Sequence, residues 1–250
     1  MSTELDFQLH DLAPADQASE RAEARYGAGD LTVLAQHHTP NRSRSFVVAH
    51  DRSATWGVPG APQIRAIKVT RDLDRNTFTF ESARHSTAPW AQNWLIERGC
   101  PPRQIGQLGG DFMQPADDLT AAIEQQLRMS GSRYEVLDSY TCDYDPCETW
   151  TLARDSHAAE DPFRLFVEEG DYEAHTYTLR EGAFADEASA RQWLDTRANP
   201  LPLEHRDEDL RARAALTRSP AASAAPHGNA SDHVTRATPI VRPSSVGRSL

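Results

Sequence analysis

Two cysteines in the second half of the chain have a spacing that could serve redox or metal chemistry. Cys142 and Cys147 bracket the sequence DYDP, in which Asp145-Pro146 indicates a turn. Cysteines on facing sides of a short hairpin can approach within disulfide distance, or supply half of a metal site. A structural zinc site usually takes four Cys or His ligands, and Cys100 is the only other cysteine. We therefore expect no metal or other cofactor and interpret the pair first as turn residues, with a redox-responsive pair as the alternative.

A second candidate set combines two histidines with an aspartate. His50 ends the second predicted strand and His85 follows the fourth, so antiparallel pairing puts both at one end of a sheet, next to Asp51. A histidine beside a carboxylate can act as a general acid or base. His37 and His38 end the first strand and fall at the opposite end, which excludes a four-histidine cluster. Solvated histidines at loop ends are the simpler interpretation.

Other catalytic templates are missing from the sequence. The chain has no GxSxG, no GxxxxGK[ST] and no GxGxxG that follows a predicted strand. No apolar run approaches the roughly 20 residues that span a bilayer. The acidic N-terminus lacks the charged-then-apolar order of a secretory signal. We therefore lean away from an enzyme and expect a cytoplasmic protein without membrane association.

An internal repeat in the sequence indicates which helices and strands position these residues. Residues 64–101 align with 163–200 at a constant shift of 99, and a second register at a shift of 103 aligns RYGAGDLTVL with RMSGSRYEVL. Such a repeat indicates two copies of one supersecondary unit. The identical pairs of the first register are Arg65/Arg164, Asp72/Asp171, Thr77/Thr176, Thr79/Thr178, Ala91/Ala190, Trp94/Trp193, Leu95/Leu194, Arg98/Arg197 and Pro101/Pro200.

Each copy predicts the same order of elements: a helix, four short strands and a second helix. Alternating apolar and polar residues are typical of a sheet with one buried face. The predicted strands lie near 31–36, 45–50, 63–70 and 76–81, and near 134–140, 148–154, 163–168 and 174–180. The opening helices lie near 14–26 and 116–129, and the closing helices begin after Ser86 or Thr87 and after Asp186.

The closing helices each carry a Trp-Leu pair that we interpret as a structural anchor. Trp94 with Leu95, and Trp193 with Leu194, form the apolar stripe that a helix turns toward a sheet. Burial of a tryptophan ring contributes a few kcal/mol. We therefore assign these residues to the core rather than to a ligand site.

The sequence thus predicts an α+β protein built from two tandem α-β-β-β-β-α modules with antiparallel sheets, an internal duplication, and a disordered C-terminal tail. Apolar residues make up 38% of the chain, which suits two modest cores better than one large one. The Ala/Ser/Pro-rich composition after Pro220 predicts disorder. The predicted divisions are a first module at 12–101, a connector at 102–115, a second module at 116–201, a possible helical extension at 202–218 and the tail at 219–250.

Charge separates the two copies. Residues 1–103 carry 12 basic and 12 acidic side chains, whereas residues 104–200 carry 7 and 20. A strongly acidic copy either keeps the protein soluble or faces a basic partner. Direct binding of nucleic acid is not favoured, because the phosphates would be repelled.

These observations lead to a functional hypothesis with two alternatives. The first is a non-enzymatic intracellular interaction or accessory protein that binds a macromolecular partner, a protein and possibly a basic one, through the acidic second module. One alternative is an enzyme that processes a small molecule between the modules near His50, Asp51 and His85. The other is a redox-responsive protein that uses Cys142 and Cys147.

Overall fold

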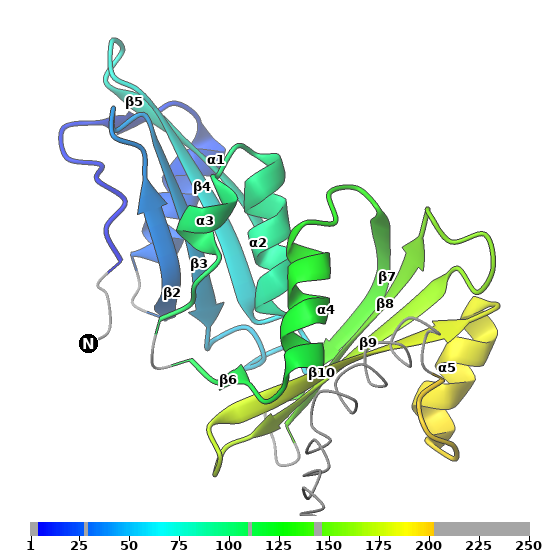
Figure 1. Cartoon of the computed structure of the whole chain (residues 1–250). Helices are drawn as coiled ribbons and strands as arrows, with labels where there is room; N and C mark the ends of the chain where they lie inside the picture. Colours follow the sequence, from blue (N-terminus) through cyan, green and yellow to red (C-terminus); the bar gives the residue numbers. More distant parts are fainter. Residues whose placement is uncertain (1–4, 28–29, 110–111, 143–146, 203–250) are drawn as a thin grey trace, which may run out of the picture.

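The computed structural model describes residues 5–27, 30–109, 112–142 and 147–202. It has the predicted α+β architecture, with two five-stranded sheets that follow one another along the chain (Figure 1). The predicted helical extension beyond Pro202 and the predicted disordered tail lie outside the described residues. Within the described residues, no helix is long and apolar enough to cross a membrane.

The first module forms a sheet in the order β1-β5-β4-β3-β2. Its long strands pair antiparallel, as predicted, and the two-residue strand β1 adds parallel to β5, which the sequence does not predict. The elements are β1 (Ala13–Pro14), α1 (Gln17–Tyr26), β2 (Leu31–His38), β3 (Arg44–Asp51), β4 (Ile64–Asp72), β5 (Thr77–His85) and α2 (Ala88–Glu97). A short helix, α3 (Pro102–Ile105), follows in the connector.

The second module repeats this topology in the order β6-β10-β9-β8-β7. Here too the first short strand, β6, pairs parallel with β10. The elements are β6 (Gln114–Pro115), α4 (Asp118–Arg128), β7 (Tyr134–Thr141), β8 (Glu148–Asp155), β9 (Phe163–Asp171), β10 (Thr176–Phe184) and α5 (Glu187–Thr196).

Irregular features recur at corresponding places in the two modules. The register of β2 against β3 shifts between Val33 and Ala35, and that of β7 against β8 shifts between Val136 and Asp138. These bulges coincide in the register of shift 103 that aligns the two copies. β-Bulges are retained within families because they set the local twist of a strand. The shared bulge therefore agrees with an internal duplication.

Of the four long helices in the described part of the chain, three begin at an aspartate that caps them. The side chains of Asp16, Asp117 and Asp186 accept hydrogen bonds from the backbone N–H of the residue three positions later, which satisfies one otherwise unpaired donor. Helix α2 is different. Its N-cap is Thr87, whose side chain makes no capping hydrogen bond, and a proline follows in the first turn.

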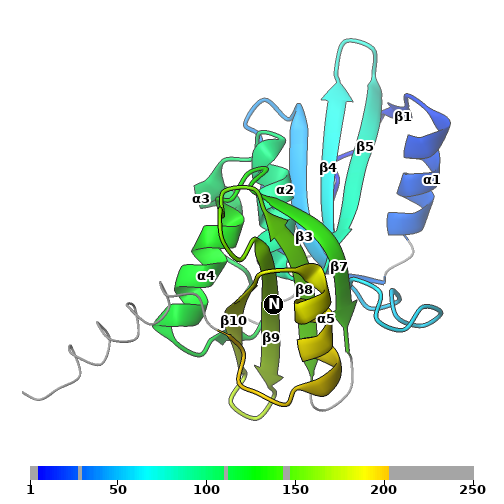
Figure 2. The same cartoon turned by 90° about the vertical axis from the view of Figure 1, so that its right-hand side faces the viewer.

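Each sheet is covered on both faces, so the expectation of a sheet with one buried face is wrong. Residues Phe46–Ala49 of β3 are all 0% exposed, because alternate side chains enter two different cores. Val47 and Ala49 pack in the core on the α1 side, and Phe46 and Val48 pack against α2. In the second module, α4 covers one face of the sheet and α5 the other (Figure 2).

The Trp-Leu pairs that recur in the two modules pack at the edges of these cores. Leu95 is fully buried, and Trp94 is half-buried beside it with the Arg98 guanidinium 3.7 Å from its ring centre. Trp193 and Leu194 are half-buried against the α5 face of the second sheet. The packing of both pairs therefore agrees with the interpretation as anchors.

The two modules meet at a pair of helices, α2 and α4, that lie side by side between the sheets (Figure 1). Trp90 of α2 is 5% exposed and enters the core of the second module, where its ring centre lies 5.6 Å from those of Tyr134 and Phe166. The side chain of Asn93 donates to and accepts from the backbone of Gly131, each over 2.9 Å. Helix α2 thus belongs to both cores.

Candidate functional site

The structure places His50 and His85 at the same end of the first sheet, as predicted, but in different surroundings. Each lies directly opposite Ile64 on the intervening strand β4. The Nε2 atom of His50 lies 3.3 Å from Oε1 of Gln63, beside a cavity between the modules. The His85 ring packs near Trp94, and its pKa is lowered to about 4 by burial and by a nearby arginine. His85 therefore stays neutral near pH 7.

Asp51 takes part in a buried ion pair. Its Oδ2 atom accepts a hydrogen bond from Arg65 over 2.8 Å and lies 3.5 Å from Arg84. Burial favours the neutral acid, but hydrogen bonds from Ser53 and Arg65 outweigh it, so that the pKa of Asp51 is lowered. A carboxylate held in this way is a poor proton acceptor. Asp51 and His85 are not among the residues that line the cavity beside His50.

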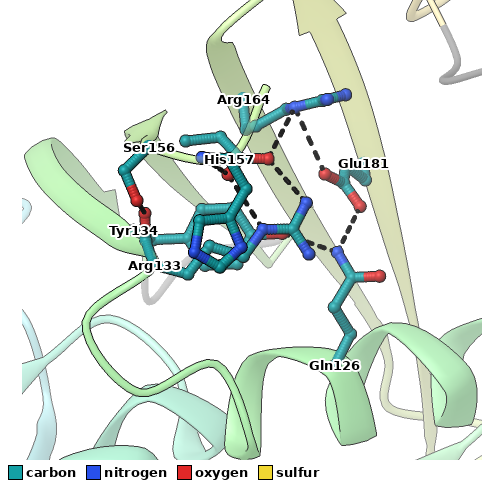
Figure 3. Close-up of polar contacts among 8 residues, drawn as sticks. Gln126, Arg133, Tyr134, Ser156, His157, Arg164 and Glu181 are labelled. Carbon is teal, nitrogen blue, oxygen red and sulfur yellow. Dashed lines mark hydrogen bonds and ion pairs between the residues drawn. The ribbon is translucent and has the colours of Figure 1, made fainter. Parts of the chain in front are cut away.

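The second module contains a corresponding buried ion-pair network that sequence reasoning missed (Figure 3). Asp155, which ends β8 as Asp51 ends β3, accepts from Arg133 over 2.6 and 2.8 Å. Arg164 lies 3.6 Å from Asp155 and 3.7 Å from Glu181, and these three side chains are at most 5% exposed. One sequence signal for this network was available. Arg65 and Arg164 are identical positions of the repeat, and each follows a strand that ends in aspartate.

This network continues onto helix α4. Gln126 donates to Glu181 over 2.9 Å and to the hydroxyl of Tyr134 over 2.7 Å (Figure 3). Burial favours the neutral form of Asp155, but hydrogen bonds from Arg133 and from the backbone of His157 outweigh this effect and lower its pKa. Two acids and two arginines balance one another here, so we assign the network a structural role.

A cavity of about 370 Å³ lies between the modules and holds several of the predicted candidates. His50 and Ile64 line it from the first sheet, and Thr87 lines it from the start of α2. Cys142 and Cys147 line it from the second module. His50 and the two cysteine candidates, which the sequence analysis treated as separate, therefore share one cavity.

The two cysteines flank a hairpin whose central residues lie outside the described part of the chain. The thiol of Cys147 lies 3.5 Å from the carbonyl oxygen of Cys142. Cys100 is elsewhere, and burial raises its pKa to about 12, which makes it unreactive. Among the residues described, no group of three or more His, Cys, Asp or Glu side chains could hold a metal ion.

An acidic side chain that the sequence analysis did not single out, Glu168 of β9, also lines the cavity. It stands directly opposite Thr149 of β8, which in turn stands opposite Thr141 of β7. Burial, reinforced by the neighbouring Glu124 carboxyl, raises the pKa of Glu168 to about 8. Burial also raises the pKa of Glu124 to about 7, although Arg128 opposes this shift. Two carboxyl groups near the module boundary are thus poised to hold protons close to neutral pH.

A second cluster of carboxyl groups lies at the end of the second sheet where β8 begins and β9 ends. We define this acidic end by Glu148, Glu169, Asp171 and Glu173. Glu148 and Glu169 are direct cross-strand neighbours. Asp171, which ends β9, and Glu173, in the turn that follows, are exposed. Between them, Tyr172 is 59% exposed.

The corresponding end of the first module carries mixed charge. Arg44 begins β3 where Glu148 begins β8, and its cross-strand neighbour is the uncharged Thr70. Arg75 lies 3.7 Å from Asp72 in the turn between β4 and β5. Ala174 takes the place of this arginine in the second module. The two modules therefore differ in charge at equivalent positions of one scaffold.

Comparisons with known proteins add no family to these observations. No family model, no curated protein and no solved structure matches the chain. Function is therefore inferred from the cavity and from the distribution of charge.

Proposed function

We propose that this chain is a non-enzymatic binding protein whose acidic second module contacts a basic macromolecular partner, a protein. The observation that carries the proposal is the acidic end of the second sheet. Three of its four carboxyl groups are exposed. Among the described residues, only Glu148 of the four forms an ion pair, with Arg197 over 2.5 Å.

Electrostatic complementarity explains why such a surface favours a basic partner. Like-charged neighbours on a sheet repel one another, and an opposite charge on a partner relieves that repulsion. The exposed Tyr172 adds an aromatic contact of the kind enriched in protein interfaces. Phosphate groups would be repelled by the same surface, so nucleic acid does not fit it.

The arrangement of the histidine candidates also favours binding over catalysis. Asp51 is held by Arg65, and the pKa of His85 is far below neutral, so neither complements His50 as a proton carrier. The alternative of a small-molecule site between the modules keeps the support of the cavity that His50, Cys142 and Cys147 line. A redox role for the two cysteines stays a prediction.

The proposal is tested by neutralising the acidic end. The full-length variant Glu169→Gln/Asp171→Asn/Glu173→Gln and the wild-type chain serve as bait in an affinity capture from the native cytosol, at low and moderate salt. Three interfacial charges at roughly 0.5 kcal/mol each predict about tenfold weaker binding of the partner. The wild-type complex should also weaken at the higher salt.

A matched control lies at the corresponding turn of the first module. Asp72→Asn/Asp74→Asn removes carboxylates from equivalent positions and should leave the captured partner unchanged. Circular dichroism of both variants checks that the fold is intact. Equal capture by the wild-type chain and the triple variant would contradict the proposal.

A further inference from the structure

The cavity between the modules is lined by polar groups that would attract opposite charges, one an anion and the other a cation. One is the N-terminus of α2, a helix of 10 residues, with Thr87 at its cap. The first turn of α2 contains no acidic residue, whereas aspartate caps α1, α4 and α5. The N–H groups and the positive dipole end of a helix attract an anion. This end of α2 therefore offers a place for a negatively charged group.

Two buried hydroxyl groups point to a ligand at the same place. Thr87 is 3% exposed and Thr141 is 5% exposed, and the Oγ1 atom of each has no hydrogen-bond partner among the described residues. Both residues line the cavity. A buried hydroxyl without a partner is unfavourable, because it has lost its bonds to water. A bound anion would accept hydrogen bonds from both.

Thr87 and Thr141 line the same cavity because α2 begins against β8. The Ser86 side chain, which precedes the cap, hydrogen-bonds to Thr151. Thr149 lies two residues earlier in β8 and on the same face, opposite Thr141. The start of α2 and the threonines of the second sheet thus face one another across the module boundary.

Glu168 is the polar group of the opposite kind. It continues the row of Thr141 and Thr149 onto β9, and its side chain forms no hydrogen bond or ion pair with another described residue. Burial raises the pKa of Glu168 to about 8, and its acidic neighbour Glu124 adds to this shift. An ammonium group beside Glu168 would supply the missing counter-charge.

The size and walls of the cavity limit what can occupy it. About 370 Å³ admits a small molecule. Leu34 and Ile64 from the first module, with Phe112 and Met113 from the connector, add apolar surface. Thr141 and Glu168 are two strands apart, so their Cα atoms are separated by about 10 Å. A glutamate side chain and a small amino acid together fill that gap.

We propose that the cavity binds a small zwitterion of the amino acid class, with its carboxylate at the N-terminus of α2 beside Thr87 and Thr141 and its ammonium group beside Glu168. The apolar walls then receive the side chain of the ligand. This inference goes beyond the proposed function and does not rest on it, because no carboxyl group of the acidic end lines the cavity.

Isothermal titration calorimetry of the full chain tests the inference with the twenty amino acids as probes. The amino acid that binds best is then compared with its decarboxylated amine and its deaminated acid. We expect at least about tenfold weaker binding of either single-charge probe, since each leaves one end of the site without its partner. No binding by any of the twenty, or equal binding of a single-charge probe, would overturn the proposal.

Variants assign the two ends separately. Glu168→Gln and Thr141→Val should each weaken binding of the amino acid by about tenfold or more. Glu169→Gln, at the next residue and on the opposite face of the sheet, is the matched control and should bind normally. Ammonium binding ionises Glu168, so proton release near pH 7 should appear in buffers of different ionisation enthalpy. Normal binding by Glu168→Gln or Thr141→Val would overturn the corresponding assignment.

The result is separable from the test of the proposed function. The variant Glu169→Gln/Asp171→Asn/Glu173→Gln keeps every residue of the cavity, so it should bind the amino acid like the wild-type chain. Loss of partner capture together with normal amino acid binding would therefore agree with both proposals. Loss of amino acid binding in that variant would assign the ligand to the acidic end and overturn the cavity site.

Discussion

At the scale of single residues, the catalytic candidate Asp51 lies in a buried ion pair, and Asp155 repeats this arrangement in the second module. Asp51 and Asp155 each end the second long strand of their module and each pairs with an arginine of the next strand. Burying charges is costly, and the cost is offset only when the partners are close and hydrogen-bonded. A duplicated aspartate-arginine pair is therefore a fold feature that both copies retain.

Replacement of Asp155 by asparagine tests this role. Asp155→Asn leaves Arg133 and Arg164 with Glu181 as their remaining buried counter-charge, and we expect a loss of about 3–5 kcal/mol in the free energy of unfolding. Urea denaturation measures the loss. Asp138→Asn, at an exposed ion pair with Arg191, is the control and should cost less than about 1 kcal/mol.

The same variant predicts a direction for pH dependence. The pKa of Asp155 is lowered in the folded chain, so its contribution is complete above the unfolded value of about 3.9. The contribution is lost as pH falls through the lower folded value. The stability difference between wild type and Asp155→Asn should therefore be constant near neutrality and shrink in strong acid. A difference that grows on acidification would contradict the ion-pair assignment.

At the scale of elements, the helix N-termini show which predicted capping residues make a capping hydrogen bond in this fold. Asp186 accepts a hydrogen bond from the Ser189 N–H over 2.8 Å, as an N-cap should. Thr87 is also an N-cap residue by sequence, yet its side chain makes no such bond. The N-terminus of α2 is enclosed by the second module, whereas that of α5 is exposed.

Alanine substitutions should separate the two caps. Asp186→Ala removes a capping bond and should lower the free energy of unfolding by about 1 kcal/mol. Thr87→Ala removes no capping bond and should cost less, because the hydroxyl that is lost has no partner among the described residues. Thermal denaturation of both variants without added ligand checks the order. A larger loss for Thr87→Ala would show that this hydroxyl does support the fold.

At the scale of the whole molecule, α2 makes the two modules one structure. It covers the first sheet with Leu95 and packs Trp90 against Tyr134 and Phe166 of the second module. The cavity exists only because the modules are held in this arrangement. A side chain shared by two cores should make their unfolding cooperative.

Removal of Trp90 tests the coupling. Trp90→Ala should lower the free energy of unfolding by about 3–5 kcal/mol and separate the unfolding of the modules into two calorimetric transitions. Trp56→Ala, at a side chain that is 77% exposed, is the control and should leave the unfolding profile unchanged. A single transition of undiminished cooperativity in Trp90→Ala would mean that other contacts join the modules.

Much of the fold follows from local sequence signals. The repeat predicts two modules of one topology, and the order of helix, four long strands and helix is confirmed in both. The positions of Asp186 and Thr87 predict the starts of α5 and α2, and strand order predicts that His50 and His85 share one end of a sheet. Caps, turns and periodicity act between residues that are near in sequence, so they can be recognised without a structure.

The partners of these residues depend on contacts between distant segments. The sequence does not show that both faces of each sheet are covered, that two-residue strands extend them, or that Arg65 neutralises Asp51. Nor does it show that Trp90 enters the core of the other module, or that Glu168 and the start of α2 line one cavity. The amino-acid sequence by itself determines the elements and their duplication. Only the tertiary structure decides which faces are buried together, because burial and charge pairing are settled by residues that are remote along the chain.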